Sequence, residues 1–214
     1  LLIEFGVASG GGLFNIAKIA KKLSKIYKID YEVIGFDTGK GLPPPLDYRD
    51  HPEAYFEGDF PPLKLDNSQL PQKTKLIYGN IKDTINDFCK NFINTESKIG
   101  FVSIDVDYYS STVDCLEIFK MPANNYLSRV STYCDDITHD IHNQFCGILL
   151  AINEFNNQEE RRKISKREYL RYKRIFKTPI YLDQMYYVHI FDHQIRSIKT
   201  KLDTKKNIIK NYEI

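Results

Sequence analysis

The chain has 214 residues, of which 42% are hydrophobic and 27% charged, and its formal net charge is +2. This length suits one sizeable α/β domain and is short for two. The near-neutral charge excludes a whole-protein field that would attract nucleic acid, and no apolar run approaches the ~20 residues that span a bilayer. Neither nucleic acid nor a membrane is therefore an expected partner.

The cysteines and the start of the chain bear on its compartment. The four cysteines form no Cys-x-x-Cys pair, which favours free thiols in a reducing compartment over disulfides or a metal site. No basic-then-apolar signal peptide is present, so we expect a cytoplasmic protein. Leu1 is not a start methionine and lies inside a predicted strand, so we expect upstream residues to belong to the protein.

Short apolar segments that end in an acid or a glycine predict buried strands. Five such segments occur in order: Leu1–Val7, Glu32–Asp37, Lys75–Gly79, Gly100–Asp105 and Ser128–Cys134. Between and after them, apolar side chains recur at helical spacing in three stripes, which begin at Leu13, Ile81 and Phe145. Alternating strands and helices indicate an α/β fold with a doubly wound, mostly parallel sheet.

The last part of the chain has a different character. Gln158–Lys177 is strongly basic, which we interpret as the solvated surface of a helix, with an anion-binding face as the alternative. Pro179–Leu182 and Met185–Phe191 predict an antiparallel strand pair that closes a seven-stranded sheet. The pattern as a whole predicts one domain over residues 1–196 and a basic C-terminal tail over residues 197–214.

Two irregular stretches interrupt this pattern. Residues 39–65 hold six of the nine prolines together with several aromatic side chains and acids. A loop of this length in a compact domain is usually functional or disordered, and its aromatic side chains favour an ordered lid over a substrate. Residues 135–143 place acids and histidines directly after a predicted strand.

A glycine-rich turn from Glu4 to Gly12 joins the first predicted strand to an amphipathic helix. Glycines let the backbone approach a ligand closely, and a helix start offers free N–H groups to an anion. The turn has neither the Gly-Lys-Ser/Thr of a phosphate loop nor the dinucleotide fingerprint. A plain strand-to-helix turn is the alternative to a cofactor site. The residues expected to contact a cofactor are Glu4, Gly6, Ala8, Ser9 and Gly10.

The ends of the second and third strands carry residues suited to a nucleoside. Asp37, followed by Thr38, stands where an acid can accept both hydroxyls of a ribose. Asn80 follows the third strand, where its amide can bind an adenine ring or cap the next helix. Because ligands bind beyond the carboxyl ends of parallel strands, these residues and the glycine turn together predict a nucleoside pocket.

Carboxylates follow the fourth and fifth strands. Asp105 and Asp107 end the fourth strand, and Asp135 and Asp136 end the fifth. Acids held close together stay ionised only if something neutralises them, and a hard cation such as Mg²⁺ does so with oxygen ligands. Asp105, Asp135 and Asp136 are therefore candidate Mg²⁺ ligands. The alternative is that these acids cap helices or pair with Lys and Arg.

These motifs resemble those of a known family in their order along the chain. Glu4-x-Gly6 with its glycine run is similar to motif I of the class I S-adenosylmethionine-dependent methyltransferases. Four further segments resemble signatures of the macrocin-type sugar O-methyltransferases: Gly35–Pro43, Asp105–Thr112, Asp135-Asp136 and Ala151–Phe155. The resemblance runs over roughly residues 2 to 156.

The resemblance implies a Rossmann-like methyltransferase fold and a magnesium-dependent transfer of a methyl group from S-adenosylmethionine to a hydroxyl. It implies that Asp105, Asp135 and Asp136 bind the metal and that Asp105 also borders the cofactor. It also implies that Asp105 receives the hydroxyl proton, with Asp107 as a second candidate; Asp105 is preferred because it lies nearer the strand end. His139 and His142, in the loop after the acid pair, are further candidate bases or ligands because histidine titrates near neutrality. The alternative is that they are simply polar residues of a loop.

The expected partner is a sugar or another small-molecule substrate, and a homodimer is an open alternative to a monomer. Two other functions also stay open. One is a domain of the same fold that binds the cofactor without catalysis, and the other is a methyltransferase for another acceptor class. A nicotinamide-dependent oxidoreductase would need the dinucleotide fingerprint that the chain lacks.

Overall fold

The computed structural model describes residues 1–60, 65–92, 96–138 and 141–197. The strands are β1 (Leu2–Phe5), β2 (Val33–Asp37), β3 (Thr74–Tyr78), β4 (Ile99–Ile104), β5 (Tyr126–Cys134), β6 (Arg162–Lys166) and β7 (Met185–Ile190). The helices are α1 (Gly11–Tyr27), α2 (Ile81–Phe92), α3 (Tyr109–Leu116), α4 (Gly147–Gln158) and α5 (Tyr181–Gln184). Short 3-10 turns include η1 (Tyr48–Asp50) and η5 (Arg171–Lys173). Within these ranges, no helix is both long and apolar enough to cross a membrane.

The strands form a seven-stranded sheet in the order β3-β2-β1-β4-β5-β7-β6. Neighbours from β3 to β5 are parallel, whereas β7 runs antiparallel to β5 and β6. The strand order reverses between β1 and β4, and Phe5 pairs with Phe36 on one side and Ile104 on the other. Three strands therefore end level at the switch point. The predicted α/β class, mostly parallel sheet and C-terminal antiparallel pair are confirmed.

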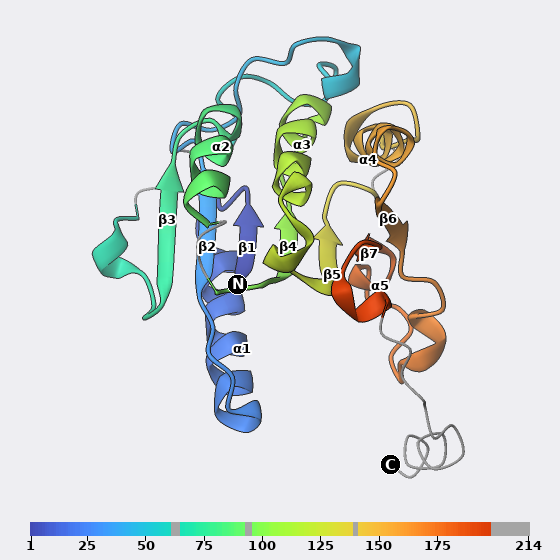
Figure 1. Cartoon of the computed structure of the whole chain (residues 1–214). Helices are drawn as coiled ribbons and strands as arrows, with labels where there is room; N and C mark the ends of the chain where they lie inside the picture. Colours follow the sequence, from blue (N-terminus) through green and yellow to red (C-terminus); the bar gives the residue numbers. More distant parts are fainter. Residues whose placement is uncertain (61–64, 93–95, 139–140, 198–214) are drawn as a thin grey trace.

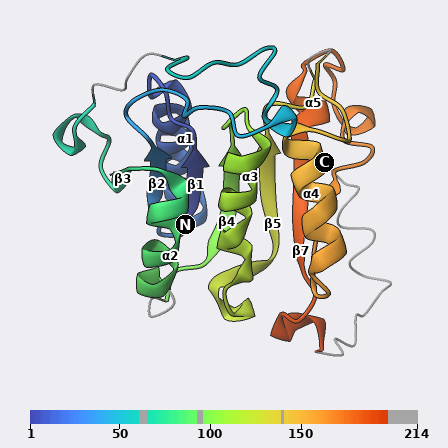
Figure 2. The ribbon, with the colours of Figure 1, turned by 90° about the horizontal axis from the view of Figure 1, so that it is seen from above.

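Side chains of the central strands point alternately to two cores, as the period of two in a strand requires. Ile3 and Phe5 belong to the larger core, together with buried residues of α2, α3 and α4. Val33 and Leu76 belong to a smaller core with buried residues of α1. Figures 1 and 2 show α1 on one face of the sheet and α2, α3 and α4 on the other.

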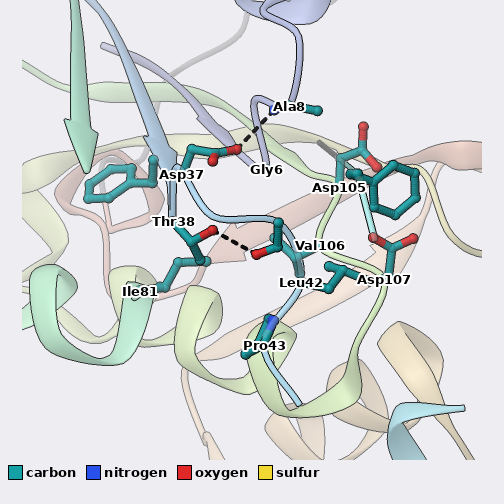
Figure 3. A pocket seen from close by; sticks show the side chains of 14 residues that line it. Gly6, Ala8, Asp37, Thr38, Leu42, Pro43, Ile81, Asp105, Val106 and Asp107 are labelled. Atoms are coloured by element: carbon teal, nitrogen blue, oxygen red, sulfur yellow. Dashed lines mark hydrogen bonds between the residues drawn. The ribbon is translucent and has the colours of Figure 1, made fainter. Parts of the chain in front are cut away.

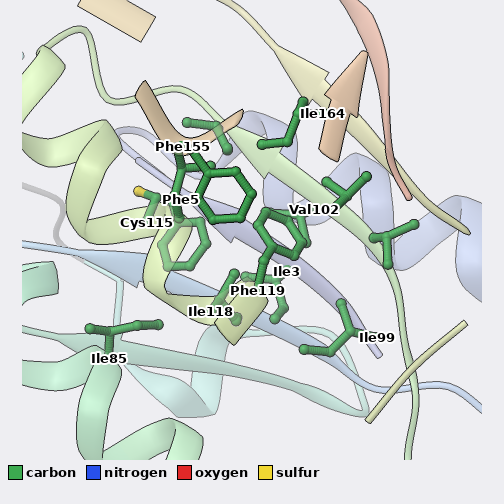
Figure 4. Packing of buried hydrophobic residues seen from close by; sticks show 14 of the residues in the cluster. Ile3, Phe5, Ile85, Ile99, Val102, Cys115, Ile118, Phe119, Phe155 and Ile164 are labelled. Carbon is green, nitrogen blue, oxygen red and sulfur yellow. The ribbon is translucent and has the colours of Figure 1, made fainter. Parts of the chain in front are cut away.

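Aromatic rings fill much of the larger core (Figure 4). Phe5 stacks on Phe36 with ring centroids 4.9 Å apart, and Phe36 meets the edge of Phe88 at 5.3 Å. Each such pair adds about 0.5–1.5 kcal/mol to the gain from burial. Phe5 and Phe36 directly precede Gly6 and Asp37, so this packing fixes the strand ends that carry the predicted cofactor residues.

The second strand of the antiparallel pair comes from a different segment than predicted. Pro179–Leu182 forms no strand, because the short helix α5 begins at Tyr181 and β7 pairs instead with β6. The strand β6 lies inside the stretch that we interpreted as a basic helix, Gln158–Lys177. Both interpretations are therefore wrong.

The error has a physical origin in Arg162. This side chain is buried on the same face of β6 as Ile164. One of the two inward-facing residues of the strand is therefore charged, and the alternation of apolar and polar residues that would predict a strand is lost. Burial of a guanidinium is tolerated when it is paired and hydrogen-bonded. Arg162 forms an ion pair with Asp192 and donates to the carbonyl of Met121 at 3.2 Å.

Two further expectations concern the ends of predicted elements. Phe145, which headed the third helical stripe, is 76% exposed, because α4 begins only at Gly147. Of the predicted basic tail, residues 198–214 lie outside the described part of the chain.

Candidate functional site

The glycine turn after β1 brings two strand ends into contact. Gly6 has a φ of +80°, and a Cβ added to it would lie 1.6 Å from the carbonyl oxygen of Asp105. Any other residue at this position would push β1 and β4 apart. Gly10 caps α1 with a φ of +90°, a conformation that glycine adopts without strain. The turn therefore has no side chain at Gly6 and Gly10, and its backbone is accessible where the strand order reverses.

Asp37, the last residue of β2, holds this turn in place. One of its carboxylate oxygens accepts the backbone N–H groups of Val7 and Ala8, both at 2.9 Å, and the other accepts that of Gly39 at 2.7 Å. Figure 3 shows Asp37 reaching back to Ala8. A carboxylate offers about four acceptor sites, so three are used and about one is left. The expectation that Asp37 binds a ribose stays a prediction.

Glu4 is buried beneath the turn. Its Oε1 lies so close to Gly12 that a Cβ there would approach it to 1.9 Å, and its Oε2 is buried without a hydrogen-bond partner in the described structure. Burial, followed by the nearby charges of Asp105 and Asp37, raises the pKa of Glu4 to about 8. Burial therefore disfavours the charged form of this carboxyl group.

A pocket opens in front of these strand ends (Figure 3). Its lining residues are Gly6, Ala8, Phe36, Asp37, Thr38, Gly41, Leu42, Pro43, Phe60, Ile81, Asp105, Val106, Asp107 and Ser111. Thr38 donates to the carbonyl of Gly41 at 2.7 Å, which turns the chain as it leaves β2. The described residues of the 39–65 stretch that follows are here called the lid, because Gly41, Leu42, Pro43 and Phe60 line the pocket. The pocket therefore joins a polar floor of strand ends to apolar walls from the lid and α2.

The remaining predicted cofactor residues do not line the pocket. Glu4 and Gly10 are buried, and Ser9 is exposed. Asn80 is exposed at the start of α2, where its side chain accepts the N–H of Lys82 at 3.3 Å and its carbonyl accepts that of Thr84. The structure thus shows Asn80 as a helix cap, one of the two roles expected from sequence. Its neighbour Ile81 faces the pocket instead.

The acids after β4 and β5 converge beside the pocket. Ligand atoms of Asp105, Asp135 and Asp136, here called the acidic trio, all lie within 4.8 Å of one another. Burial and then the charges of Asp136, Asp135 and Asp107 raise the pKa of Asp105 to about 8. Carboxylates that raise one another's pKa in this way form a site whose charge a cation would neutralise.

Neutral donors orient the trio. Asp135 accepts the hydroxyl of Tyr133 and the side-chain amide of Gln184, the latter at 3.0 Å. Gln184 is nearly fully buried and also donates to the backbone carbonyl of Asp135 at 2.6 Å. The backbone N–H of Asp107 donates to Asp136 at 2.9 Å. Gln184, in α5, is a site residue that the sequence analysis missed.

Asp107 lies between the trio and the lid. Its φ of +58° is unusual for a residue other than glycine, and its carboxylate hydrogen-bonds the hydroxyl of Tyr55. Burial and the charge of Asp136 raise the pKa of Asp107 above its ordinary range. Tyr55 is one of the aromatic side chains in residues 39–65, and no local sequence pattern predicts this contact with Asp107.

Two buried polar residues fasten the lid over the site. Asp50 is 1% exposed, and its carboxylate accepts the backbone N–H and the hydroxyl of Ser110, at 2.8 and 2.9 Å. His51 is equally buried, with its ring edge-on to His142 at 5.3 Å. Because buried polar groups are costly unless they are bonded, the two hydrogen bonds between Asp50 and Ser110 give this part of the lid a defined position. The predicted base His139 lies outside the described residues.

Neither a protein-family model nor a curated protein matches the chain, but solved structures share its fold. One described as the structure of the O-methyltransferase NovP matches with a TM-score of 0.54 and 16% identity, over 88% of this chain and 70% of NovP. The crystal structure of CalS11, calicheamicin methyltransferase, matches with a TM-score of 0.53 and 16% identity, over 88% of this chain and 71% of CalS11. The chain therefore has the α/β fold of these two methyltransferases.

Proposed function

We propose that the protein is an S-adenosylmethionine-dependent O-methyltransferase, assisted by Mg²⁺, that acts on a hydroxyl of a sugar or a glycosylated small molecule. The observation that carries this proposal is the convergence of the glycine turn, Asp37 and the acidic trio around the same pocket. The fold shared with NovP and CalS11 supports the same class of reaction. The sugar acceptor rests on the resemblance of the sequence motifs.

The cofactor half of the pocket, from Glu4 to Asp37, fits a nucleoside with a charged tail. Gly6 leaves room for close approach, Asp37 keeps about one acceptor site for a ribose hydroxyl, and Phe36 and Ile81 offer apolar walls to a purine. Within the described part of the chain, Oε2 of Glu4 is buried under the turn without a hydrogen-bond partner. Bound S-adenosylmethionine would supply a methyl group on a sulfonium as the electrophile.

The donor set of the acidic trio fits a hard divalent cation. Its members are carboxylates, which Mg²⁺ prefers as ligands, and the raised pKa of Asp105 reflects the repulsion that a cation would relieve. Mg²⁺ held by these three residues would bind the acceptor oxygen and lower the pKa of its hydroxyl. Tyr133 and Gln184 hold Asp135 in place for this role.

Within this proposal Asp107 takes up the hydroxyl proton. It lines the pocket beside Asp105, and it is outside the trio and free of a role as ligand. A base works best when its pKa lies near the working pH, and the raised pKa of Asp107 moves it in that direction. The hydrogen bond from Tyr55 fixes the orientation of the carboxylate.

Transfer of a labelled methyl group tests this function. The protein is incubated with methyl-labelled S-adenosylmethionine and a panel of free sugars, nucleotide sugars and glycosides, in Mg²⁺ or in EDTA. We expect label in at least one acceptor class, lost in EDTA and in Asp136→Ala and retained in Asp87→Ala, which removes an exposed acid of α2. Cofactor binding without transfer to any acceptor would favour a binding domain without catalysis. Equal transfer in EDTA would remove the metal from the mechanism.

A further inference from the structure

The segment Tyr169–Tyr181, here called the tongue, combines exposed apolar side chains with positive charge. It holds four Lys or Arg residues and no acid. Tyr169, Tyr172, Ile175 and Phe176 are 70%, 76%, 92% and 77% exposed. Single exposed apolar residues need no explanation, but a group of this kind marks a contact with another molecule.

The tongue is held in shape at both ends. Leu170 and Leu182 are almost completely buried, so the two ends are anchored in the protein. Arg171 forms an ion pair with Asp183 and donates to the carbonyl of Lys177, which ties the two sides of the tongue together. The side chains between these anchors are therefore exposed on a loop that its own contacts hold in a defined shape.

The tongue begins and ends at the same edge of the sheet as the candidate site. The backbone N–H of Arg167, just before the tongue, donates to the carbonyl of Met185 at 2.8 Å, and Met185 pairs with Tyr133 near the end of β5. Just after the tongue, the side chain of Gln184 binds Asp135 of the acidic trio. A surface that docks on the tongue would therefore lie beside the pocket. Figure 2 shows α5 at the β5–β7 end of the sheet.

The charges of the tongue indicate an anionic partner. Arg171 is paired, but Lys173, Arg174 and Lys177 form no ion pair within the described ranges of the chain. Ile175, the most exposed of these side chains, favours a lipid surface over nucleic acid. An aliphatic side chain has no π-face on which a base can stack, whereas apolar side chains flanked by Lys and Arg suit the boundary between headgroups and acyl chains.

We propose that the tongue docks on an anionic lipid surface, with Ile175 and Phe176 inserted among the lipids and Lys173, Arg174 and Lys177 against the headgroups. The methyl acceptor is then a hydroxyl on the headgroup of a membrane-held amphiphile, a point that rests on the proposed function. This proposal departs from the expectation that a membrane is no partner. That expectation rested on the lack of a membrane-spanning segment, which a peripheral contact does not need.

Vesicle flotation tests the docking with the full chain. We expect binding to vesicles of phosphatidylcholine with phosphatidylserine, weaker binding at high salt, and none to phosphatidylcholine alone. The affinity of the double variant Ile175→Ser/Phe176→Ser for these anionic vesicles should fall at least about tenfold. Lys173→Gln/Arg174→Gln should lose roughly fivefold for each charge. The control Ile26→Ser/Tyr27→Ser removes side chains that are 68% and 67% exposed at the far end of α1 and should bind like the intact chain.

Three results would overturn the docking: no binding of the intact chain to anionic vesicles, an equal loss in the α1 control, or tight binding of a fluorescent oligouridylate in place of vesicles. Circular dichroism of each variant checks its fold. Calorimetric titration with S-adenosylmethionine separates this inference from the proposed function, because the tongue variants should bind the cofactor like the intact chain. Vesicle binding by a protein that binds no cofactor would keep the docking and remove the enzyme.

Discussion

The candidate site has two halves: the cofactor half, and the acidic trio beside the pocket, here called the acidic half. They differ in how the protein accommodates negative charge. At the end of β2, three backbone N–H groups meet the carboxylate of Asp37. At the ends of β4 and β5, three carboxylates meet one another and neutral donors, and the pKa of Asp105 rises to about 8. A backbone turn can thus satisfy one acid, whereas in the proposed function the three converging acids are neutralised by a cation. In that proposal the cofactor half is preorganised, and the acidic half is completed by its ligand.

The largest expected effect comes from removing the acid of the preorganised half. Asp37→Ala leaves the N–H groups of Val7 and Ala8 without their acceptor and removes a partner for the ribose. Because hydrogen bonds to a charged group contribute about 1.5–3 kcal/mol, calorimetry should show S-adenosylmethionine affinity lowered roughly tenfold to a hundredfold. Asp30→Ala, which removes an exposed acid before β2, is the control. Unchanged affinity in Asp37→Ala would contradict the role of Asp37.

The acidic half can be weakened without touching the trio itself. Gln184→Met keeps the side-chain volume but removes both hydrogen bonds to Asp135. Loss of a group that orients a ligand typically lowers metal affinity about ten- to hundredfold, so Mg²⁺ should bind correspondingly more weakly while S-adenosylmethionine binds as before. Gln194→Met, in an exposed turn after β7, should change neither. If both ligands weaken equally, the two halves are not separable.

The contact between the lid and Asp107 should have a smaller effect. Tyr55→Phe removes one hydrogen bond to that carboxylate, worth about 1 kcal/mol. Methyl transfer should therefore fall about fivefold with cofactor affinity unchanged. Tyr48→Phe alters an exposed tyrosine of the same lid and serves as the control. An equal loss in both variants would mean that the lid acts only through its general fold.

The last prediction concerns stability and pH rather than ligand binding or transfer. Glu4 releases its proton near pH 4.5 in the unfolded chain and near pH 8 in the folded one. Between these values the folded state binds more protons, so the free energy of unfolding falls as pH rises, by at most about 1.4 kcal/mol per pH unit for each such group. Urea denaturation in EDTA should show a shallower fall for Glu4→Gln. An identical pH dependence in the variant would show that Glu4 titrates normally.

The sequence predicts what lies next to a strand end and misses what the fold brings from afar. The glycine turn, Asp37 and the acidic trio each follow an apolar strand directly, so topology alone places them at one edge. Gln184 reaches Asp135 across 49 residues, and no local pattern marks it. The strand β6 was not predicted because it buries the charged Arg162. The ion-pair partner that makes this burial possible, Asp192, is distant in the sequence. Asn80 had two roles open, and only the structure showed the helix cap.

The most direct test of the two-half pocket is calorimetric titration of the intact chain with S-adenosylmethionine, once in EDTA and once in Mg²⁺. Because the cofactor half is complete without a cation, we predict binding at one molecule per chain in both buffers, with similar affinity. The absence of binding in both would contradict the central claim. Binding only in Mg²⁺ would contradict the independence of the two halves.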